Sequence, residues 1–489
     1  KTMSQEIRNL EPKALWNQFA DLNAVPRPSK KEEQVIQFMK DFGNRLGLET
    51  FEDEIRNVII RKPATPGMEN RKPIVLQGHL DMVHQKNNDT VFDFETQGIE
   101  MYVDGDWVRA KGTTLGADNG LGVAAIMAVL ESTDIPHPAI EALFTIDEET
   151  GMTGALNLQG GILQGQILLN LDTEEDDEID IGCAGGIDVT ATAEYDEEDT
   201  PEGSVGYSIT VKGLQGGHSG MDIHKGLGNA NKIMNRLLFD GFDNFGLQIA
   251  SIAGGSLRNA IPRESVAKVI IAEVYDEAFV FDMQQIVNEI KAEFKTTEPN
   301  LEIVFEKLTE VPAKVMPSIA QFYFVRSMYT AHNGVYRMSA DFDNLVETSN
   351  NIAKVIVGEG QLAVQCLTRS SVESSKMDLA NALRSAFELM GCEVEFSGAY
   401  PGWTPNPKSE ILDVLVGIYE KQNNAKPNVV ACHAGLECGI LGTNYPEMDM
   451  ISFGPTIHGA HSPDERASIS SSQKFWKFFL EILASIPAK

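Results

Sequence analysis

The sequence is short of basic residues and long apolar runs, and each shortage excludes a class of protein. It has 40 Lys and Arg against 71 Asp and Glu, for a formal net charge of −31. Nucleic acids and anionic membranes attract basic patches, so we expect neither as a partner. The longest nearly unbroken apolar run, 123–130, is far shorter than the roughly 20 residues of a membrane-spanning helix.

Cysteine is also scarce. The five cysteines are odd in number and widely spread, and none forms a CxxC pair. This pattern argues against a disulfide framework or a thiolate zinc site and favours a reducing compartment. Residues 1–16 lack the apolar segment of a secretion signal. We therefore expect a cytoplasmic protein.

What the sequence does contain is enough apolar material for several packed cores. Hydrophobic residues make up 42% of 489 positions, which suggests two to four domains at roughly 150 residues each. Up to about residue 180, helix-like and strand-like runs alternate. The helices are expected at 32–47 and 118–132, and the strands at 57–62, 73–83, 141–149 and 166–172. Apolar strands separated by helices predict an α/β layer with a mostly parallel central sheet flanked by helices.

From about Gly185 the texture changes to an α+β pattern that runs twice, as if duplicated. Strands are expected at 207–213, 265–274, 301–307, 334–342, 361–369 and 393–398, with helices at 283–294 and 377–390. The acidic stretch 193–203 and the Pro/Gly-rich stretch 400–408 resemble connectors. We expect a split domain, 1–185 and 403–489, with a second domain, 186–402, inserted into it.

Acidic and imidazole groups collect where the expected strands of the first domain end. His79 and Asp81 close one run, Asp118 follows another, 147–149 close a third and Asp172 a fourth. In an open α/β sheet the carboxyl ends of the strands line one crevice. So many carboxylates there would repel one another, and a divalent metal cluster would remove that repulsion.

Each group taken alone has a simpler explanation. Asp118 or Asn119 could cap the following helix, residues 147–149 could complement a helix N-terminus, and His79 could be a loop histidine. The loop near the C-terminus adds His458 and His461, two of only nine histidines in the chain. Their joint occurrence favours a ligand over these separate explanations.

The motifs around these residues resemble those of a known family. Five ordered motifs are similar to the aminoacylase/carboxypeptidase-G superfamily of di-metal peptidases, over nearly the whole chain: HLDMV (79–83), GADNG (116–120), DEETG (147–151), LNLDTEE (169–175) and HSPDE (461–465). Three more resemble its aminoacyl-histidine dipeptidase (Xaa-His dipeptidase) branch: GGHSG (216–220), SLRNAIP (256–262) and HAGLECG (433–439). The resemblance implies a catalytic domain made of the two outer segments and an inserted lid.

The resemblance also implies a ligand set for two metal ions. Asp118 would bridge the ions, His79 and Asp172 would complete one site, and Glu149 and His461 the other. Nitrogen and oxygen ligands without thiolate suit two Zn²⁺ ions, with Mn²⁺ or Co²⁺ as alternatives. The resemblance further implies a cis peptide bond between Asp118 and Asn119.

Two acidic residues beside the ligands have implied roles of their own. Asp81 would orient the imidazole of His79. Glu148 would be the general base that takes a proton from the metal-bridging water, leaving hydroxide to attack the peptide carbonyl.

Residues of the inserted domain are implied in handling the substrate. His218 would donate a hydrogen bond to the oxyanion, and Asn259 and Arg369 would hold the substrate, Arg369 by pairing with a C-terminal carboxylate. His218 could instead be a polar residue of a Gly-rich turn, and Arg369 a surface charge.

Two further residues are weaker candidates for the substrate pocket. His433 and Glu437 lie in the loop that lines the pocket in relatives, where a carboxylate could receive the α-ammonium of a dipeptide. The same loop could merely be the entrance to a helix. Beyond Asp172, the acidic run 174–178 is expected to be solvated.

The expected activity is hydrolysis of Xaa-His dipeptides, including β-alanyl-histidine, by a monomer or homodimer. Two alternatives stay open. The same centre could act on tripeptides or N-acyl amino acids, or the chain could be a catalytically silent binding protein on this fold.

Overall fold

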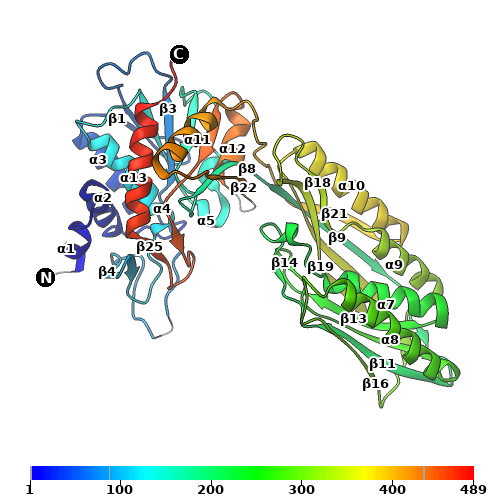
Figure 1. The fold of residues 1–489 in the computed structure, drawn as a ribbon. Helices are drawn as coiled ribbons and strands as arrows, with labels where there is room; N and C mark the ends of the chain where they lie inside the picture. Colours follow the sequence, from blue (N-terminus) through cyan, green and yellow to red (C-terminus); the bar gives the residue numbers. More distant parts are fainter. Residues whose placement is uncertain (1–2, 88, 433–435) are drawn as a thin grey trace. The chain divides into compact units, whose positions relative to one another are not determined.

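The computed structural model describes residues 3–87, 89–432 and 436–489 (Figure 1). Their contacts divide them into two compact units. The first comprises the described residues of 3–182, 405–432 and 436–489, and the second comprises 183–404. In the described part of the chain, no helix is both long enough and apolar enough to cross a bilayer.

The first unit is built on an eight-stranded sheet with parallel strands at its centre. Strands β6, β3, β7 and β23 run parallel, whereas β1 with β2, β2 with β6, and β8 with β23 pair antiparallel. The sheet order is β1 (Glu49–Glu52), β2 (Val58–Lys62), β6 (Ile140–Thr145), β3 (Ile74–His79), β7 (Ile167–Asn170), β23 (Asp449–Ser452), β8 (Glu178–Cys183) and β22 (Asn428–Cys432). Strands β6, β3 and β7 are buried throughout, as the apolar runs predict.

Helices and a smaller sheet complete this unit. The helices are α1 (Met3–Arg8), α2 (Lys13–Asn23), α3 (Glu33–Arg45), α4 (Ala117–Glu131), α5 (Glu148–Gly151), α6 (Thr153–Leu156), α11 (Glu410–Asn423), α12 (Glu437–Asn444) and α13 (Ile469–Ala484). The smaller sheet has the order β24 (Ile457–His458), β25 (Arg466–Ser468), β5 (Trp107–Ala110) and β4 (Met101–Asp104).

The central helix α4 is apolar on all sides because it packs against both α2 and β3. Residues 117–130 of this helix are all buried, as its apolar sequence predicts. The prediction that Asp118 or Asn119 caps the helix is wrong. The Asp118 carboxylate faces His79 and His461, and the Asn119 side chain accepts the His79 backbone N–H at 3.0 Å and donates to the Leu171 carbonyl at 2.7 Å.

A buried carboxylate in β8 makes the stability of this unit depend on pH. Thr173 Oγ1 donates a 2.6 Å hydrogen bond to Asp180 Oδ2, but Oδ1 has no hydrogen-bond partner among the described residues. Burial raises the pKa of Asp180 from 3.8 to about 7. The folded protein therefore holds this proton more tightly than the unfolded chain, and stability is lost as the pH rises through about 7.

Asp180→Asn is neutral at every pH and is expected to raise the free energy of unfolding at pH 8, by at most about 4 kcal/mol. At pH 4 the gain should vanish, because Asp180 is protonated in the folded protein there. Thermal unfolding at both pH values measures the difference, with the exposed Asp134→Asn as control. An equal shift at both pH values would contradict the explanation.

The second unit is a nine-stranded sheet, antiparallel at every pairing, with helices packed on one face (Figure 1, green to yellow). Its main path is β16 (Glu302–Lys307), β11 (Ser204–Lys212), β15 (Ser265–Ala272), β13 (Gln248–Gly255), β19 (Val346–Gly358), β20 (Gln361–Ser370), β9 (Gly185–Glu194) and β21 (Glu393–Tyr400), with β18 (Gly334–Met338) paired to β19. The helices are α7 (Ala230–Phe245), α8 (Asp276–Glu293), α9 (Ser318–Thr330) and α10 (Glu373–Leu389). Side chains such as Val269, Leu237, Phe279 and Leu383 form the core between helices and sheet.

The strand and helix order of this unit repeats. One half has the chain order β11, α7, β13, β15, α8, β16 and the sheet order β16-β11-β15-β13. The other has β9, α9, β19, β20, α10, β21 and the equivalent sheet order β21-β9-β20-β19. The halves join where β13 pairs with β19. The pattern thus runs twice, with the first half inserted after β9 of the second.

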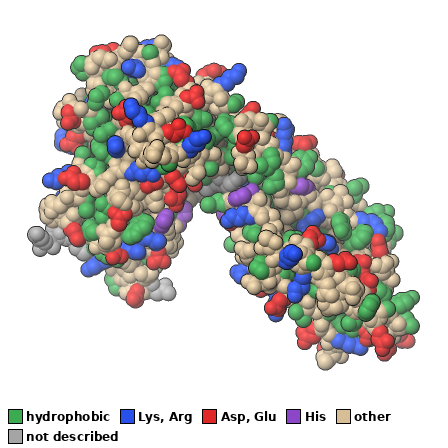
Figure 2. All heavy atoms as spheres, in the orientation of Figure 1, with side chains coloured by type: hydrophobic (Ala, Val, Ile, Leu, Met, Phe, Trp, Pro, Cys, Tyr) green, Lys and Arg blue, Asp and Glu red, His purple; other side chains and the backbone are tan. Residues whose placement is uncertain are grey.

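Two small ribbons lie outside the main sheet of this unit. They pair β10 (Glu198–Asp199) with β17 (Lys314–Val315), and β12 (Gly217–His218) with β14 (Ala260–Ile261). The acidic stretch 193–203 connects β9 to β11 within the unit. Figure 2 shows basic side chains interspersed with acidic ones on the visible face of both units.

Candidate metal centre

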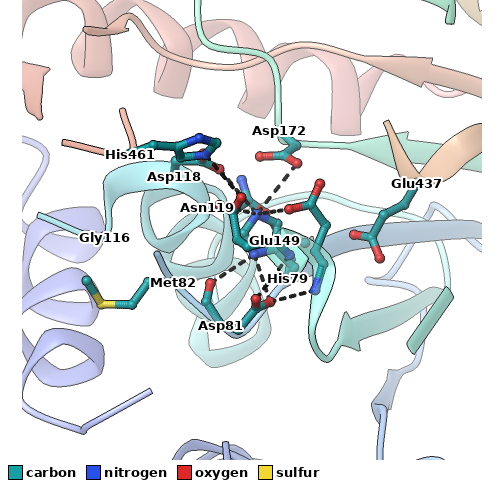
Figure 3. Close-up of polar contacts among 12 residues, drawn as sticks. His79, Asp81, Met82, Gly116, Asp118, Asn119, Glu149, Asp172, Glu437 and His461 are labelled. Atoms are coloured by element: carbon teal, nitrogen blue, oxygen red, sulfur yellow. Dashed lines mark hydrogen bonds and ion pairs between the residues drawn. The ribbon is translucent and has the colours of Figure 1, made fainter. Parts of the chain in front are cut away.

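The residues predicted from the strand ends come together in the first unit (Figure 3). His79 is the last residue of β3, residues 147–149 follow β6, and Asp172 lies two residues beyond β7. Asp118 differs from the prediction, because it enters from the start of α4 and follows no strand of the main sheet. His461 comes from the loop after β24.

The His79 imidazole lies in the middle of the cluster. Its Nε2 is 3.2 Å from Asp118 Oδ1, 3.5 Å from Glu148 Oε2, 3.8 Å from Glu149 Oε1 and 3.6 Å from Asp172 Oδ2. The imidazole is fully buried. One nitrogen therefore faces four carboxylates.

Asp118 faces two imidazoles with its two oxygens. Oδ1 lies 3.2 Å from His79 Nε2, and Oδ2 lies 3.1 Å from His461 Nε2. His461 Nε2 is also 3.0 Å from Glu149 Oε2. The peptide bond between Asp118 and Asn119 is cis, which confirms the expectation from the motifs. Asp118 is thus placed between two sets of nitrogen and oxygen atoms.

Asp81 holds the surrounding backbone and the His79 ring. His79 Nδ1 is 2.9 Å from the Asp81 carbonyl oxygen and 3.2 Å from Asp81 Oδ1. The N–H groups of Glu148 and Glu149 donate to the same carboxylate at 3.0 and 3.2 Å, and Ser29 Oγ donates at 2.6 Å. One carboxylate therefore fixes the imidazole and the start of α5 together.

The groups of the centre strongly change one another's protonation. Burial, together with Asp118, raises the pKa of Asp172 well above its usual range, and burial with Asp172 does the same for Glu148. Burial lowers the pKa of His79, but the carboxylates around it outweigh burial and raise it well above its usual range. The hydrogen bonds that the His461 ring donates to Asp118 and Glu149 raise the pKa of His461 to about 11. The cluster therefore attracts positive charge.

The donor atoms fit a pair of divalent cations. His79 Nδ1 lies beside Asp81, so its Nε2 faces the carboxylate oxygens, where a metal cation can take the place of a proton. Glu149 Oε1 is buried without a hydrogen-bond partner among the described residues. Two sets of potential ligand atoms share Asp118: one with His79 and Asp172, the other with Glu149 and His461. Imidazole and carboxylate donors suit Zn²⁺, Mn²⁺ or Co²⁺.

The acidic run after Asp172 is less solvated than predicted. Glu174 is half-buried, and burial with the neighbouring Asp118 and Asp172 raises its pKa to about 10. Asp176 is also partly buried and accepts hydrogen bonds from Ser471 and Lys474. The expectation of a solvated run is therefore wrong at these positions.

Glu437 lies close to the centre but is fully buried. It begins α12, and its Oε1 accepts hydrogen bonds from Gln77 Nε2 at 2.8 Å and Thr145 Oγ1 at 2.9 Å. This position favours the alternative explanation, a residue at a helix entrance, over contact with a substrate ammonium. His433 lies outside the described residues. His458 is apart from the cluster, 3.2 Å from Glu175.

The three candidates of the second unit lie near one another. β12 pairs His218 with Ala260, and the Ser219 N–H donates to the Asn259 carbonyl at 2.8 Å. Arg369 is buried, and its Nε donates to Ser219 Oγ at 3.4 Å. Burial and the nearby Arg369 lower the pKa of His218, which favours the neutral ring.

The sequence patterns did not identify the residues of segment 27–32, which hydrogen-bond to the groups around the centre. Besides Ser29, the Glu32 carboxylate accepts the Asp147 N–H at 3.0 Å and Lys30 Nζ donates to Asp147 Oδ2 at 3.3 Å. These residues carry no motif of their own, so only their contacts identify them. The sequence patterns also did not identify Glu465 as a supporting residue, although it lies four residues after His461 in the HSPDE motif.

Comparisons with known proteins identify the family of this chain. Residues 75–485 match the model of peptidase family M20/M25/M40. The chain is 44% identical over 488 residues to the cytosol non-specific dipeptidase of Escherichia coli (strain K12), covering 99% of this chain and 100% of the relative.

Solved structures extend the comparison. The crystal structure of aminoacylhistidine dipeptidase from Vibrio alginolyticus matches with a TM-score of 0.95 at 45% identity, covering 99% of both chains. Aminopeptidase PepT from Bacillus cereus shares the fold alone, with a TM-score of 0.56 at 16% identity over 98% of this chain and 99% of that one. The resemblance expected from the motifs is confirmed. Because the family match covers most of its length, the chain belongs to peptidase family M20/M25/M40.

Proposed function

We propose that this chain is a dipeptidase that hydrolyses Xaa-His dipeptides, including β-alanyl-histidine, at a pair of divalent metal ions. The main support for the proposal is the position of Asp118. Its two carboxylate oxygens lie 3.2 Å from His79 Nε2 and 3.1 Å from His461 Nε2. Both full-length relatives are named dipeptidases, one non-specific and one for aminoacylhistidine. The proposed location is the cytoplasm, which the name of the Escherichia coli relative supports.

The proposed ligands divide into two sets that share Asp118. His79 and Asp172 would hold one ion, and Glu149 and His461 the other, preferably as Zn²⁺. Bound divalent ions would act as Lewis acids on the peptide carbonyl and lower the pKa of water. Asp81 would keep His79 in the tautomer that presents Nε2 to a metal.

Glu148 is proposed as the general base. Its N–H is anchored on Asp81, and its carboxylate lies 3.5 Å from His79 Nε2, beside the ligands. From there it can take a proton from the attacking water and deliver that proton to the leaving amine.

The second unit is proposed to act as a lid that supplies donors to the substrate. His218 Nδ1 accepts the N–H groups of Gly220 and Met221 at 3.0 and 3.1 Å. A neutral ring therefore carries its proton on Nε2, which can donate to the developing oxyanion. Arg369 would pair with the C-terminal carboxylate of the peptide, and Asn259 would help to hold it.

A substrate panel with and without metal tests this function. Hydrolysis of β-alanyl-histidine and another Xaa-His dipeptide is expected to exceed that of a dipeptide without histidine, a tripeptide and an N-acetyl amino acid. Chelation should reduce turnover to background, and Zn²⁺, Mn²⁺ or Co²⁺ should restore it. Faster cleavage of the tripeptide or the N-acetyl amino acid would favour the alternative substrates. Two bound ions without hydrolysis of any compound would favour a silent binding protein.

A further inference from the structure

The loop that carries His461 also carries a buried acid that the proposed mechanism does not use. Glu465 is 2% exposed. Glutamate is almost never buried to this degree unless its charge is compensated. Its burial therefore calls for partners that stabilise the carboxylate.

Those partners are backbone N–H groups of the segment that carries Asp118. Glu465 Oε1 accepts hydrogen bonds from the N–H groups of Leu115 and Gly116 at 2.8 and 2.9 Å, and Oε2 accepts from the N–H of Asp118 at 3.1 Å. The N–H groups at the start of a helix lack partners within the helix and favour an anion. Glu465 therefore fixes the backbone at the entrance to α4.

Arg27 donates hydrogen bonds to backbone carbonyl groups of the same segment and of its neighbour. Its Nη2 donates to the Gly116 carbonyl at 2.8 Å and its Nη1 to the Leu80 carbonyl at 3.2 Å, with the guanidinium buried. A Cβ on Gly116 would lie 2.6 Å from Arg27 Nη2, and Gly116 has a φ of 76°, so a larger residue does not fit here. The positive charge of Arg27 also offsets the buried charge of Glu465.

Glu465 connects this segment to the turn that holds His461. The N–H of Glu465 donates to the Ser462 carbonyl at 3.0 Å, and the N–H of Ser462 donates to the Gly459 carbonyl at 3.2 Å. His461 lies within this hydrogen-bonded turn. The side chain of Glu465 thus joins two segments that are nearly 350 residues apart in sequence and that supply Asp118 and His461.

We propose that Glu465 is a positioning residue that holds Asp118 and His461 at one spacing, and so sets the affinity of the metal site they share with Glu149. The inference rests on the proposed pair of ions. Its effect should be unequal, because Glu465 holds two ligands of this site, Asp118 and His461, but only Asp118 of the other, whose remaining ligands His79 and Asp172 it does not contact in the described structure.

Metal binding by Glu465→Gln tests this role. The amide places an N–H donor against backbone N–H donors, so the hydrogen bonds to the Asp118 segment are weakened. We expect one of the two Zn²⁺ affinities of the metal-free full chain to fall by about 10- to 100-fold, and the other to fall less, because it shares only Asp118. Calorimetric titration with Zn²⁺ measures both, and Asp464→Asn, an exposed neighbour, should bind as the wild type does.

A second variant identifies which site is affected. Adding Glu465→Gln to His461→Ala should lower the affinity of that site less than Glu465→Gln does alone, because one of the two ligands that Glu465 positions is already gone. Unchanged affinities in Glu465→Gln, equal losses at both sites, or full additivity with His461→Ala would overturn the inference. If Glu465→Gln does not fold, Glu465→Asp is titrated instead, and the same unequal loss is expected. Wild-type affinities in that variant would overturn the inference too. Failure of the wild type to bind two ions would refute the proposed metal pair itself.

Discussion

Glu148→Gln is expected to lower kcat on a dipeptide by about 10²- to 10⁴-fold while both metal ions remain bound. The amide keeps the shape of the side chain and its backbone bond to Asp81, but it cannot accept a proton. Because Glu148 belongs to neither of the sets that share Asp118, metal affinity should change little. The kcat and the metal content of the purified variant are measured together.

The matched control for this variant is Glu100→Gln, which makes the same change at an exposed position of the same unit. It should retain wild-type kcat. Wild-type activity in Glu148→Gln would remove this residue from the mechanism. Loss of activity together with loss of metal would make Glu148 a ligand and not a base.

Asp118→Asn is expected to weaken the binding of both metal ions, and not of just one, and to abolish turnover. An amide offers a single oxygen as ligand and carries no charge, whereas Asp118 directs one oxygen to each imidazole. Losing a residue that merely orients a ligand costs about 10- to 100-fold in metal affinity, so losing the shared ligand should cost more than about 100-fold at both sites. Zinc titration of the metal-free variant measures this.

Two other variants make the result specific. His461→Ala should weaken the binding of one ion and leave the binding of the other unchanged, because His461 contacts only the ligand set that contains Glu149. Asp134→Asn, an exposed position, should bind both ions normally. If Asp118→Asn loses a single ion, the carboxylate is not shared and the proposed arrangement is wrong.

The fold of the first unit was predictable because continuous apolar segments of the sequence form its core. Strands β3, β6 and β7 and helix α4 are buried almost throughout, so hydrophobic residues mark them directly. The polar residues that end these strands stand out against that background. This contrast is why His79 and Asp172 were recognisable from sequence.

Strand β19 was not predicted because polar side chains form part of its core. Thr348, Ser349, Asn350 and Asn351 are buried there. The Asn351 side chain donates to the carbonyls of Arg258 and Ala260, so hydrogen bonds replace the apolar contacts that sequence patterns detect.

The supporting residues of the centre were hidden for a related reason. Glu174 stands in an acidic run, and such a run normally predicts exposure. It is half-buried only because the chain packs it against Asp118 and Asp172. The buried Glu465 carboxylate likewise accepts hydrogen bonds from backbone N–H groups nearly 350 residues away in sequence. Contacts of this kind depend on the tertiary fold, which no local pattern records.

The central claim is that two divalent ions share the carboxylate of Asp118. Anomalous diffraction from crystals of the zinc-loaded protein, collected on both sides of the zinc edge, tests it most directly. We expect two peaks, one contacted by His79 and Asp172 and the other by Glu149 and His461, with Asp118 contacting both. A single peak, or two peaks that Asp118 does not join, would contradict it.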